Sequence, residues 1–221
     1  MPRPQARHHV NRQRQRADYD RTGIHRILDA GRIAHVGFSV RAQPFVIPML
    51  YVRDGESLLL HGSLGSRLMR TLGSGVAACV SVALVDGLVL ARSHFHHSMN
   101  YRSVVVYGRA VAIDDPAEKA AGLERLVEGL IPGRASEARP ADAQELAATA
   151  LLRLQIEDAS AKVRTGPPSD AIEDRELPFW AGELPLHPRY DAVLPAPDVA
   201  ADTPLPNSLR RLLATHYAVP A

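Results

Sequence analysis

Three strand-like runs follow one another in residues 33–61, IAHVGFSVRAQPFVIPMLYVRDGESLLLH. They contain many β-branched and aromatic residues and are separated by turn residues, as is typical of short β-strands. Asp54-Gly55 favours a two-residue hairpin turn between the last two runs. Pro48 cannot donate a ladder hydrogen bond, so we expect the second run to lie at a sheet edge or a bulge. The runs are residues 33–40, 45–52 and 57–61.

The rest of the first 160 residues alternates between further strands and short helices. Asp86-Gly87 is a second hairpin signal between two apolar runs. Asp115-Pro116 opens a helix, and Pro132-Gly133 ends it. This pattern predicts a mainly β protein with flanking helices, arranged as a small antiparallel barrel or sandwich. The remaining strands are expected at 76–84, 88–92, 101–113 and 151–158, and the remaining helices at 23–30 (capped by Thr22), 63–72 and 141–151.

Composition excludes several classes of protein. The 221 residues are 46% hydrophobic and 23% charged, which is ordinary for a globular protein. No stretch approaches the roughly 18–20 apolar residues of a membrane helix. The N-terminus has no apolar core of the kind a secretory signal needs, so we expect a cytoplasmic protein without a membrane partner. Cys79 is the only cysteine, which excludes a disulfide or a multi-cysteine zinc site, and its apolar strand favours an inert thiol.

Composition also divides the chain into three parts. Residues 1–19 are expected to be a flexible basic arm, residues 20–165 the folded domain, and residues 166–221 a proline-rich extension that wraps over it, with a short helix at 209–217. A basic arm can bind nucleic acid, but no recognition motif follows and aromatic residues are few, so a solvated terminus is favoured. The arginines concerned are Arg3, Arg7, Arg12, Arg14, Arg16 and Arg21.

Residues 61–70, HGSLGSRLMR, combine a strand end, a Gly/Ser turn and a helix start. Backbone N–H groups at a helix start favour an anion. Ser63 and Ser66 add hydroxyl donors, and Arg67 adds a bidentate guanidinium. The stretch is therefore a candidate phosphate cradle; the alternative is an ordinary capped helix after a hairpin.

Two further stretches carry polar groups beside strands. In residues 98–108, SMNYRSVVVYG, Asn100 and Arg102 share one face of a strand, and Tyr101 and Ser103 share the other. The alternative is a strand start with solvated ends. In residues 93–97, SHFHH, a strand would place His94 and His96 on one face, a spacing that can ligate a metal or haem. A solvated or cofactor-facing loop containing His94, His96 and His97 is the alternative.

The order of these motifs resembles the pyridoxamine 5′-phosphate oxidase-like flavoproteins, and in particular their flavin-nucleotide-binding branch, which includes nitroimidazole-resistance proteins. The resemblance covers about residues 20–165. The tail matches loosely at KVRTGPP (162–168) and LPFWAGELPL (177–186). It implies an FMN-binding split β-barrel that forms a homodimer, with FMN at the dimer interface. The extension would then wrap the barrel or the dimer.

The resemblance also carries roles to individual positions. The second predicted strand would run beside the isoalloxazine ring, and the end of the third would contact the flavin. A Ser-Arg pair would hold the phosphate. The polar start of the long strand at 101–113 would reach the flavin, with a serine where the family has glutamine. A C-terminal aromatic would cover the site. The residues are, in that order, Ile47, Pro48, Met49 and Leu50; His61, Gly62 and Ser63; Ser66 and Arg67; Asn100, Tyr101, Arg102 and Ser103; and Trp180.

Two departures bear on the reaction. The stretch IPMLYV (47–52) carries no charge, where the oxidase has phosphate-binding basic residues, and Trp180 is not followed by the substrate-gripping arginine. Pyridoxamine phosphate is therefore not the expected substrate. The sequence favours an FMN-dependent oxidoreductase acting on another small molecule, with no catalytic side chain identified. The alternatives are a non-catalytic flavin or haem carrier, a deazaflavin in place of FMN, and a nucleic-acid-binding regulator.

Overall fold

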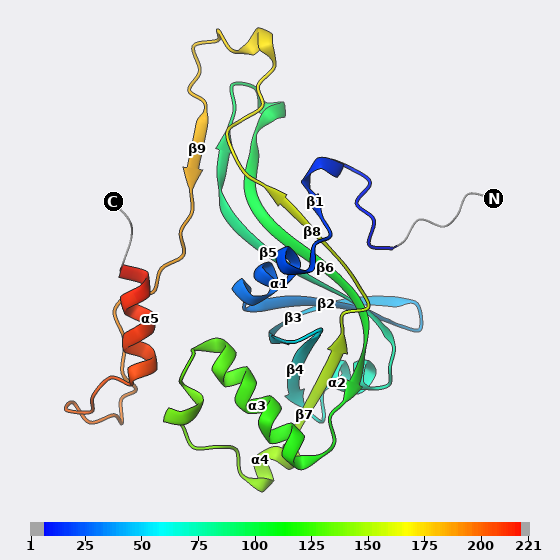
Figure 1. Cartoon of the computed structure of the whole chain (residues 1–221), viewed down its shortest axis with the longest axis vertical. Helices are drawn as coiled ribbons and strands as arrows, with labels where there is room; N and C mark the ends of the chain where they lie inside the picture. Colours follow the sequence, from blue (N-terminus) through cyan, green and yellow to red (C-terminus); the bar gives the residue numbers. More distant parts are fainter. Residues whose placement is uncertain (1–6, 218–221) are drawn as a thin grey trace.

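The computed structural model describes residues 7–217, and its elements form one sheet system with helices around it (Figure 1). The predicted class, mainly β with flanking helices, is confirmed. The strands are β1 (Ala17–Asp18), β2 (Ile33–Val40), β3 (Gln43–Asp54), β4 (Ser57–Ser63), β5 (Ala77–Leu90), β6 (Ser98–Ala112), β7 (Thr149–Gln155), β8 (Asp158–Arg164) and β9 (Gly182–Pro185). The α-helices are α1 (Arg21–Ala30), α2 (Arg67–Gly73), α3 (Pro116–Leu130), α4 (Ala143–Ala148) and α5 (Asn207–Tyr217), and the 3-10 turns are η1 (Arg14–Arg16), η2 (His94–His96), η3 (Ala135–Glu137) and η4 (Ile172–Asp174).

Antiparallel pairing closes six of the strands into a barrel. The strand order is β1-β8-β6-β7-β4-β3-β2-β5-β9, and an additional β5–β6 pairing joins the two sides. The long strand β6 changes partner along its length: residues 101–107 pair with β8, whereas 110–112 pair with β7. Because β7 and β8 leave β6 in different directions, the barrel is split, as the resemblance implied.

The interior is filled by the alternate side chains of these strands. Along β2, Ala34, Val36 and Phe38 are buried, whereas their neighbours face outward. This period of two is what a sheet with one face on the core requires. A smaller apolar cluster lies under α3, formed by Leu59, Ile113, Leu126 and Leu151 with partly buried neighbours.

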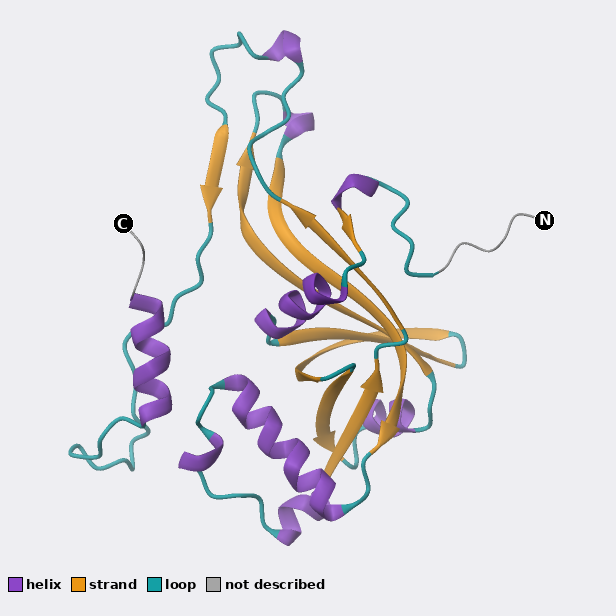
Figure 2. Ribbon diagram, in the orientation of Figure 1, coloured by secondary structure: helices purple, strands orange, loops and turns teal. Residues whose placement is uncertain are grey.

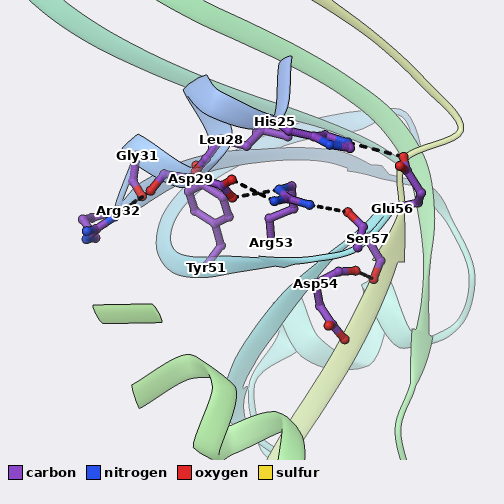
Figure 3. Close-up of polar contacts among 11 residues, drawn as sticks. His25, Leu28, Asp29, Gly31, Arg32, Tyr51, Arg53, Asp54, Glu56 and Ser57 are labelled. Carbon is purple, nitrogen blue, oxygen red and sulfur yellow. Dashed lines mark hydrogen bonds and ion pairs between the residues drawn. The ribbon is translucent and has the colours of Figure 1, made fainter. Parts of the chain in front are cut away.

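Helix α1 is fastened to β3 by polar contacts at its C-terminal end (Figure 3). The Tyr51 hydroxyl donates to the Leu28 carbonyl at 2.5 Å, and Arg53 holds Asp29 through two nitrogens at 2.7 and 2.8 Å. The helix begins at Arg21 rather than at 23, because the Asp20 carboxylate, not Thr22, accepts the Gly23 N–H. Asp at this position is among the preferred N-caps.

Two local predictions concerned turns, and only one of them is correct. The hairpin predicted at Asp54-Gly55 is present: Asp54 pairs with Ser57, and Gly55, at φ 59°, and Glu56 form the loop. Pro48 lies in the half of β3 that pairs only with β2, so its expected edge position is confirmed. The Asp86-Gly87 hairpin is wrong: β5 continues to Leu90 with a bulge between Val85 and Gly87, because β6 and β9 pair with this stretch from both sides.

The ends of β5 and β6 project from the barrel as a long arm whose tip is η2 (Figure 2). Strand β9, in the C-terminal extension, runs antiparallel to β5 along this arm. Neither β8 nor β9 was expected from the sequence. At Gly87 an added Cβ would lie 2.8 Å from the Leu184 carbonyl oxygen, so glycine permits the close approach of β9.

No helix in residues 7–217 is long and apolar enough to cross a membrane. Two arginines at the N-terminal side are held by acidic groups of the barrel: Arg7 by Glu157 and Asp158, and Arg21 by Glu56. Arg3 lies outside the described residues. The three-part division of the chain stays a prediction.

Candidate functional site

One group of predicted site residues lies together where β3, β4 and α2 meet. Residues 47–50 of β3 have β2 on one side and no strand on the other, since β4 pairs only with residues 51–54. Ile47 is 36% exposed, Pro48 is exposed, and Met49 and Leu50 are half-buried. This edge offers an apolar wall to a flat ligand.

His61, near the end of β4, carries a polar atom that no protein group satisfies. Its Nδ1 is buried and has no hydrogen-bond partner within the described residues. Burial lowers the pKa of the ring, so the imidazole is neutral at pH 7. A buried nitrogen without a partner costs stability unless a ligand or water supplies the bond. Next to it, Gly62 lets Met69 of α2 approach, since an added Cβ would lie 3.0 Å from the Met69 side chain.

The turn between β4 and α2 is tied by the serines that the sequence singled out. The Ser66 N–H donates to the Ser63 carbonyl at 2.9 Å, and the Gly65 N–H donates to the Ser63 hydroxyl at 3.2 Å. Helix α2 begins at Arg67, four residues later than expected, because this turn occupies residues 63–66. Ser66 makes no side-chain cap bond. Since α2 has seven residues, an anion here would depend mainly on side chains.

Arg67 supplies the cation of this group. Its guanidinium lies over the Phe45 ring, 4.9 Å from the ring centre. No carboxylate in residues 7–217 pairs with it, and the side chain is exposed. Phe45, near the start of β3, was missed from the sequence, where only its place beside a turn could have signalled it. An arginine stacked on an aromatic ring and free of acidic partners is suited to bind a phosphate.

A second group of predicted residues, on β6, lies on the arm. Arg102 holds Asp86 of β5 through two nitrogens at 2.7 and 2.9 Å, and this hydrogen bonding raises the pKa of Arg102. Ser103 donates to the Lys162 carbonyl at 3.2 Å. Asn100 is buried: its Oδ1 accepts from the Arg164 guanidinium, and its Nδ2 donates to the Glu183 carboxylate at 2.5 Å. Tyr101, which pairs with Arg164 across β6 and β8, is half-buried.

The structure thus divides the predicted residues into two groups within one chain. The side-chain hydrogen bonds of Asn100, Arg102 and Ser103 go to β5, β8 and β9, not to β3, β4 or α2. Trp180 is 68% exposed, and its ring leans over Gly182 beside the arm. The flavin-contacting role of each of these residues stays a prediction.

The histidines of residues 93–97 form the tip of the arm. They do not continue a strand as the spacing argument assumed, because η2 turns the chain here. The His97 Nδ1 lies 2.9 Å from the Ser93 carbonyl oxygen, and the His94 and His97 ring centres are 6.5 Å apart. Phe95, between them, is 88% exposed. In residues 7–217 no three His, Cys, Asp or Glu side chains gather closely enough to hold a bare metal ion.

Cys79 lies half-buried on β5, and burial raises the pKa of its thiol, which keeps it protonated and unreactive.

Comparison with known proteins agrees with this geometry. A sequence model of the family described as pyridoxamine 5′-phosphate oxidase matches residues 20–163. The chain belongs to this family. The matched stretch runs from the N-cap of α1 to β8 and therefore contains the whole barrel. No curated protein matches the chain.

Two solved structures resemble almost the whole chain. The flavocytochrome Anf3 from Azotobacter vinelandii is 42% identical, with 93% of this chain and 96% of that chain covered and a TM-score of 0.87. An FAD and haem binding protein from Mycobacterium smegmatis is 40% identical, with 89% and 97% covered and a TM-score of 0.86. Both matches cover more of the chain than residues 20–163, which contain the barrel.

A proposed 5-nitroimidazole antibiotic resistance protein from Bacteroides thetaiotaomicron shares the fold at 20% identity, with 66% and 86% covered and a TM-score of 0.57.

Proposed function

We propose that this protein is a homodimeric redox protein that binds a flavin against β3, β4 and α2 and a haem at the tip of the β5–β6 arm. The observation that carries the proposal is the likeness, over nearly the full chain, to a flavocytochrome and to an FAD and haem binding protein at 42% and 40% identity. The FAD and haem binding protein favours FAD over the FMN expected from the sequence, and deazaflavin is a further alternative to be titrated.

The β3–β4–α2 group fits a flavin. The exposed edge of residues 47–50 suits an aromatic ring system, and the unpartnered His61 Nδ1 can bond a polar atom at its rim. Arg67, already positioned by Phe45, supplies a charge for a phosphate. Neutral His61 adds no charge of its own to this site.

The separation of the two groups supports a dimer. If the β6 residues also contact the flavin, as the family resemblance implies, they must come from a second copy, because their partners within one chain lie on the arm. Exposed apolar side chains on β3 and β6, including Val46 and Val111, are available for such an interface.

The tip of the arm fits a haem. The His97 Nδ1 faces the Ser93 carbonyl at 2.9 Å, so it must carry the proton, and Nε2 is left as a free acceptor. This is how histidines that bind iron are ordinarily held, through a bond that fixes the tautomer. His94 and His96 make no comparable bond to the backbone in the described residues. His97 is therefore the residue that would hold the haem iron.

Flavin and haem together supply one- and two-electron transfer, which would let the protein act on a small acceptor without an acid–base residue of its own. The chain contributes an apolar wall at 47–50, a cation at Arg67 and a fixed imidazole at His97. A carrier without turnover would use the same residues, so the two roles differ only in reaction with an external donor and acceptor.

The proposal is tested by absorption titration of the purified protein with FMN, FAD, deazaflavin and ferric haem. We expect saturable binding of one flavin and of haem, and loss of the Soret shift in His97→Ala with flavin binding intact. His94→Ala and the tail variant His187→Ala are matched controls that should keep the Soret shift. Indifference to every flavin and to haem would refute the proposal. Turnover of a nitroaromatic or quinone with NAD(P)H would distinguish an oxidoreductase from a carrier.

A further inference from the structure

A cavity of about 340 Å³ lies beside the histidine tip, between the end of β5 and the C-terminal extension. Its walls come from Arg92 after β5, from the loop that follows β8, and from the segment that leads into β9. The lining includes Arg92, Pro167, Pro168, Asp170, Arg175 and Gly182. None of these residues belongs to the predicted flavin site.

The cavity has an excess of positive charge. Arg92 is paired with Asp170, whose oxygens accept from its backbone N–H at 3.0 Å and from Nη1 at 2.7 Å. Burial raises the pKa of Asp170, but these bonds, with the attraction of Arg92 and His96, lower it below its usual value. Asp170 is therefore ionised and neutralises one arginine. Arg175 has no ion pair in residues 7–217, so one positive charge is left over.

Among the described residues, Asp170 is the only acidic one that lines the cavity. Glu173, Asp174 and Glu176 flank Arg175 in the sequence but do not line the cavity. Two buried donors at the same end of β5, Arg92 Nε and Ser93 Oγ, have no partner in the described part of the chain. Donors left without acceptors beside an unpaired arginine indicate a site for an anion.

The surroundings indicate which anion. Ser93, next to Arg92, is also the residue whose carbonyl fixes His97, so the cavity and the candidate haem ligand share one turn. His96 is close enough to Asp170 to affect its ionisation. The Trp180 ring lies against Gly182 of the lining and is 68% exposed, and Phe95, in the same turn as His97, is 88% exposed. An apolar, flat ligand that carries carboxylates would satisfy the rings and the arginines at once.

We propose that the Arg92–Arg175 cavity binds the propionate carboxylates of the haem whose iron His97 ligates. This inference rests on the proposed haem function and specifies a part of the site that the sequence did not indicate. Arg175 is the direct partner of a propionate. Asp170 is a positioning residue, because it holds Arg92 at the cavity wall through two bonds.

Haem affinity, measured by Soret titration, tests the proposal with ferric haem and with its dimethyl ester, which lacks the two charges. For Arg175→Gln we expect about a tenfold weaker binding of ferric haem and unchanged binding of the ester. Arg26→Gln, a change on the exposed face of α1, is the matched control and should leave both affinities unchanged. Arg92→Gln combined with Asp170→Asn removes both charges of the ion pair, so that no lone buried carboxylate is left. This double variant should bind ferric haem more weakly than the wild type.

Each contrary result has a distinct meaning. Wild-type protein that binds neither haem nor its ester overturns the haem function and this inference with it. If the wild type binds haem and Arg175→Gln binds it equally tightly, the propionate site alone is overturned. The same holds if Arg175→Gln lowers the affinities for haem and for the ester equally. If Arg175→Gln instead weakens FMN or FAD and spares haem, the anion in the cavity is a flavin phosphate, and the propionate assignment is wrong.

Discussion

Replacing Arg67 by alanine is the most specific perturbation of the flavin site. The guanidinium stacks on Phe45 at 4.9 Å and has no carboxylate partner in the described residues, so its loss leaves no orphaned charge. The stability of the protein should therefore change by less than about 0.5 kcal/mol. A bound phosphate, in contrast, would lose a charge-assisted contact of roughly 1.5–3 kcal/mol. That loss corresponds to about ten- to a hundredfold weaker binding.

Flavin fluorescence titrations with FMN and riboflavin separate this effect from a general disturbance. Riboflavin has no phosphate, so Arg67→Ala should weaken FMN binding and leave riboflavin binding unchanged. Arg70→Ala is the matched control, since Arg70 is on the same helix but lines a cavity beside β7, which Arg67 does not line. Phe45→Leu removes only the ring beneath the guanidinium and should weaken FMN by about 0.5–1 kcal/mol, or roughly two- to fivefold.

The reasoning is refuted if Arg67→Ala binds FMN as tightly as the wild type, because the phosphate would then lie elsewhere. An equal loss of FMN and riboflavin would also refute it, since Arg67 would then act through the shape of the turn rather than through its charge.

Three further predictions concern the scaffold. Tyr51→Phe leaves the buried Leu28 carbonyl without its donor and should lower the free energy of unfolding in urea by about 1–3 kcal/mol; an unchanged midpoint would contradict this. Gly87→Ala places a Cβ 2.8 Å from the Leu184 carbonyl oxygen, so the pairing of β9 with β5 should weaken and amide hydrogen exchange in residues 182–186 should accelerate. Unaltered protection there would show that β9 tolerates the change. Because burial lowers the pKa of His61, the unfolded chain binds its proton more readily, and stability should fall as pH drops below about 6.5. His61→Gln should flatten that part of the thermal-unfolding profile, and an identical slope would assign it to other groups.

The fold was predictable where local chemistry alone determines it. Asp54-Gly55 turns the chain because a two-residue loop needs positive φ, and Pro48 restricts its half of β3 to an edge. Asp86-Gly87 has the same appearance in the sequence but lies inside β5, since pairing with β9, about a hundred residues away, overrides the turn preference. Strand β8 was missed because its mixed residues, DASAKVR, do not alternate clearly between polar and apolar.

The site was predictable to the extent that it is continuous in sequence. Residues 63–66 turn the chain from β4 into α2, and Tyr51, which follows residues 47–50, pairs with Leu60, which precedes His61. The sequence could not predict which polar side chains are already paired within the protein, because their hydrogen-bond and ion-pair partners come from distant elements. Asp86 satisfies Arg102, and Asp170 reaches Arg92 across 78 positions of the chain. No local pattern distinguishes these arginines from the unpaired Arg67.

Native mass spectrometry of the protein as purified tests the central claim most directly, because one spectrum reports the oligomeric state and the mass of every bound cofactor. The account predicts a dimer that carries flavin and haem, with the mass of the flavin distinguishing FAD from FMN. A protein whose mass is that of the polypeptide alone, and which gains neither cofactor after incubation with FAD and ferric haem, would contradict it.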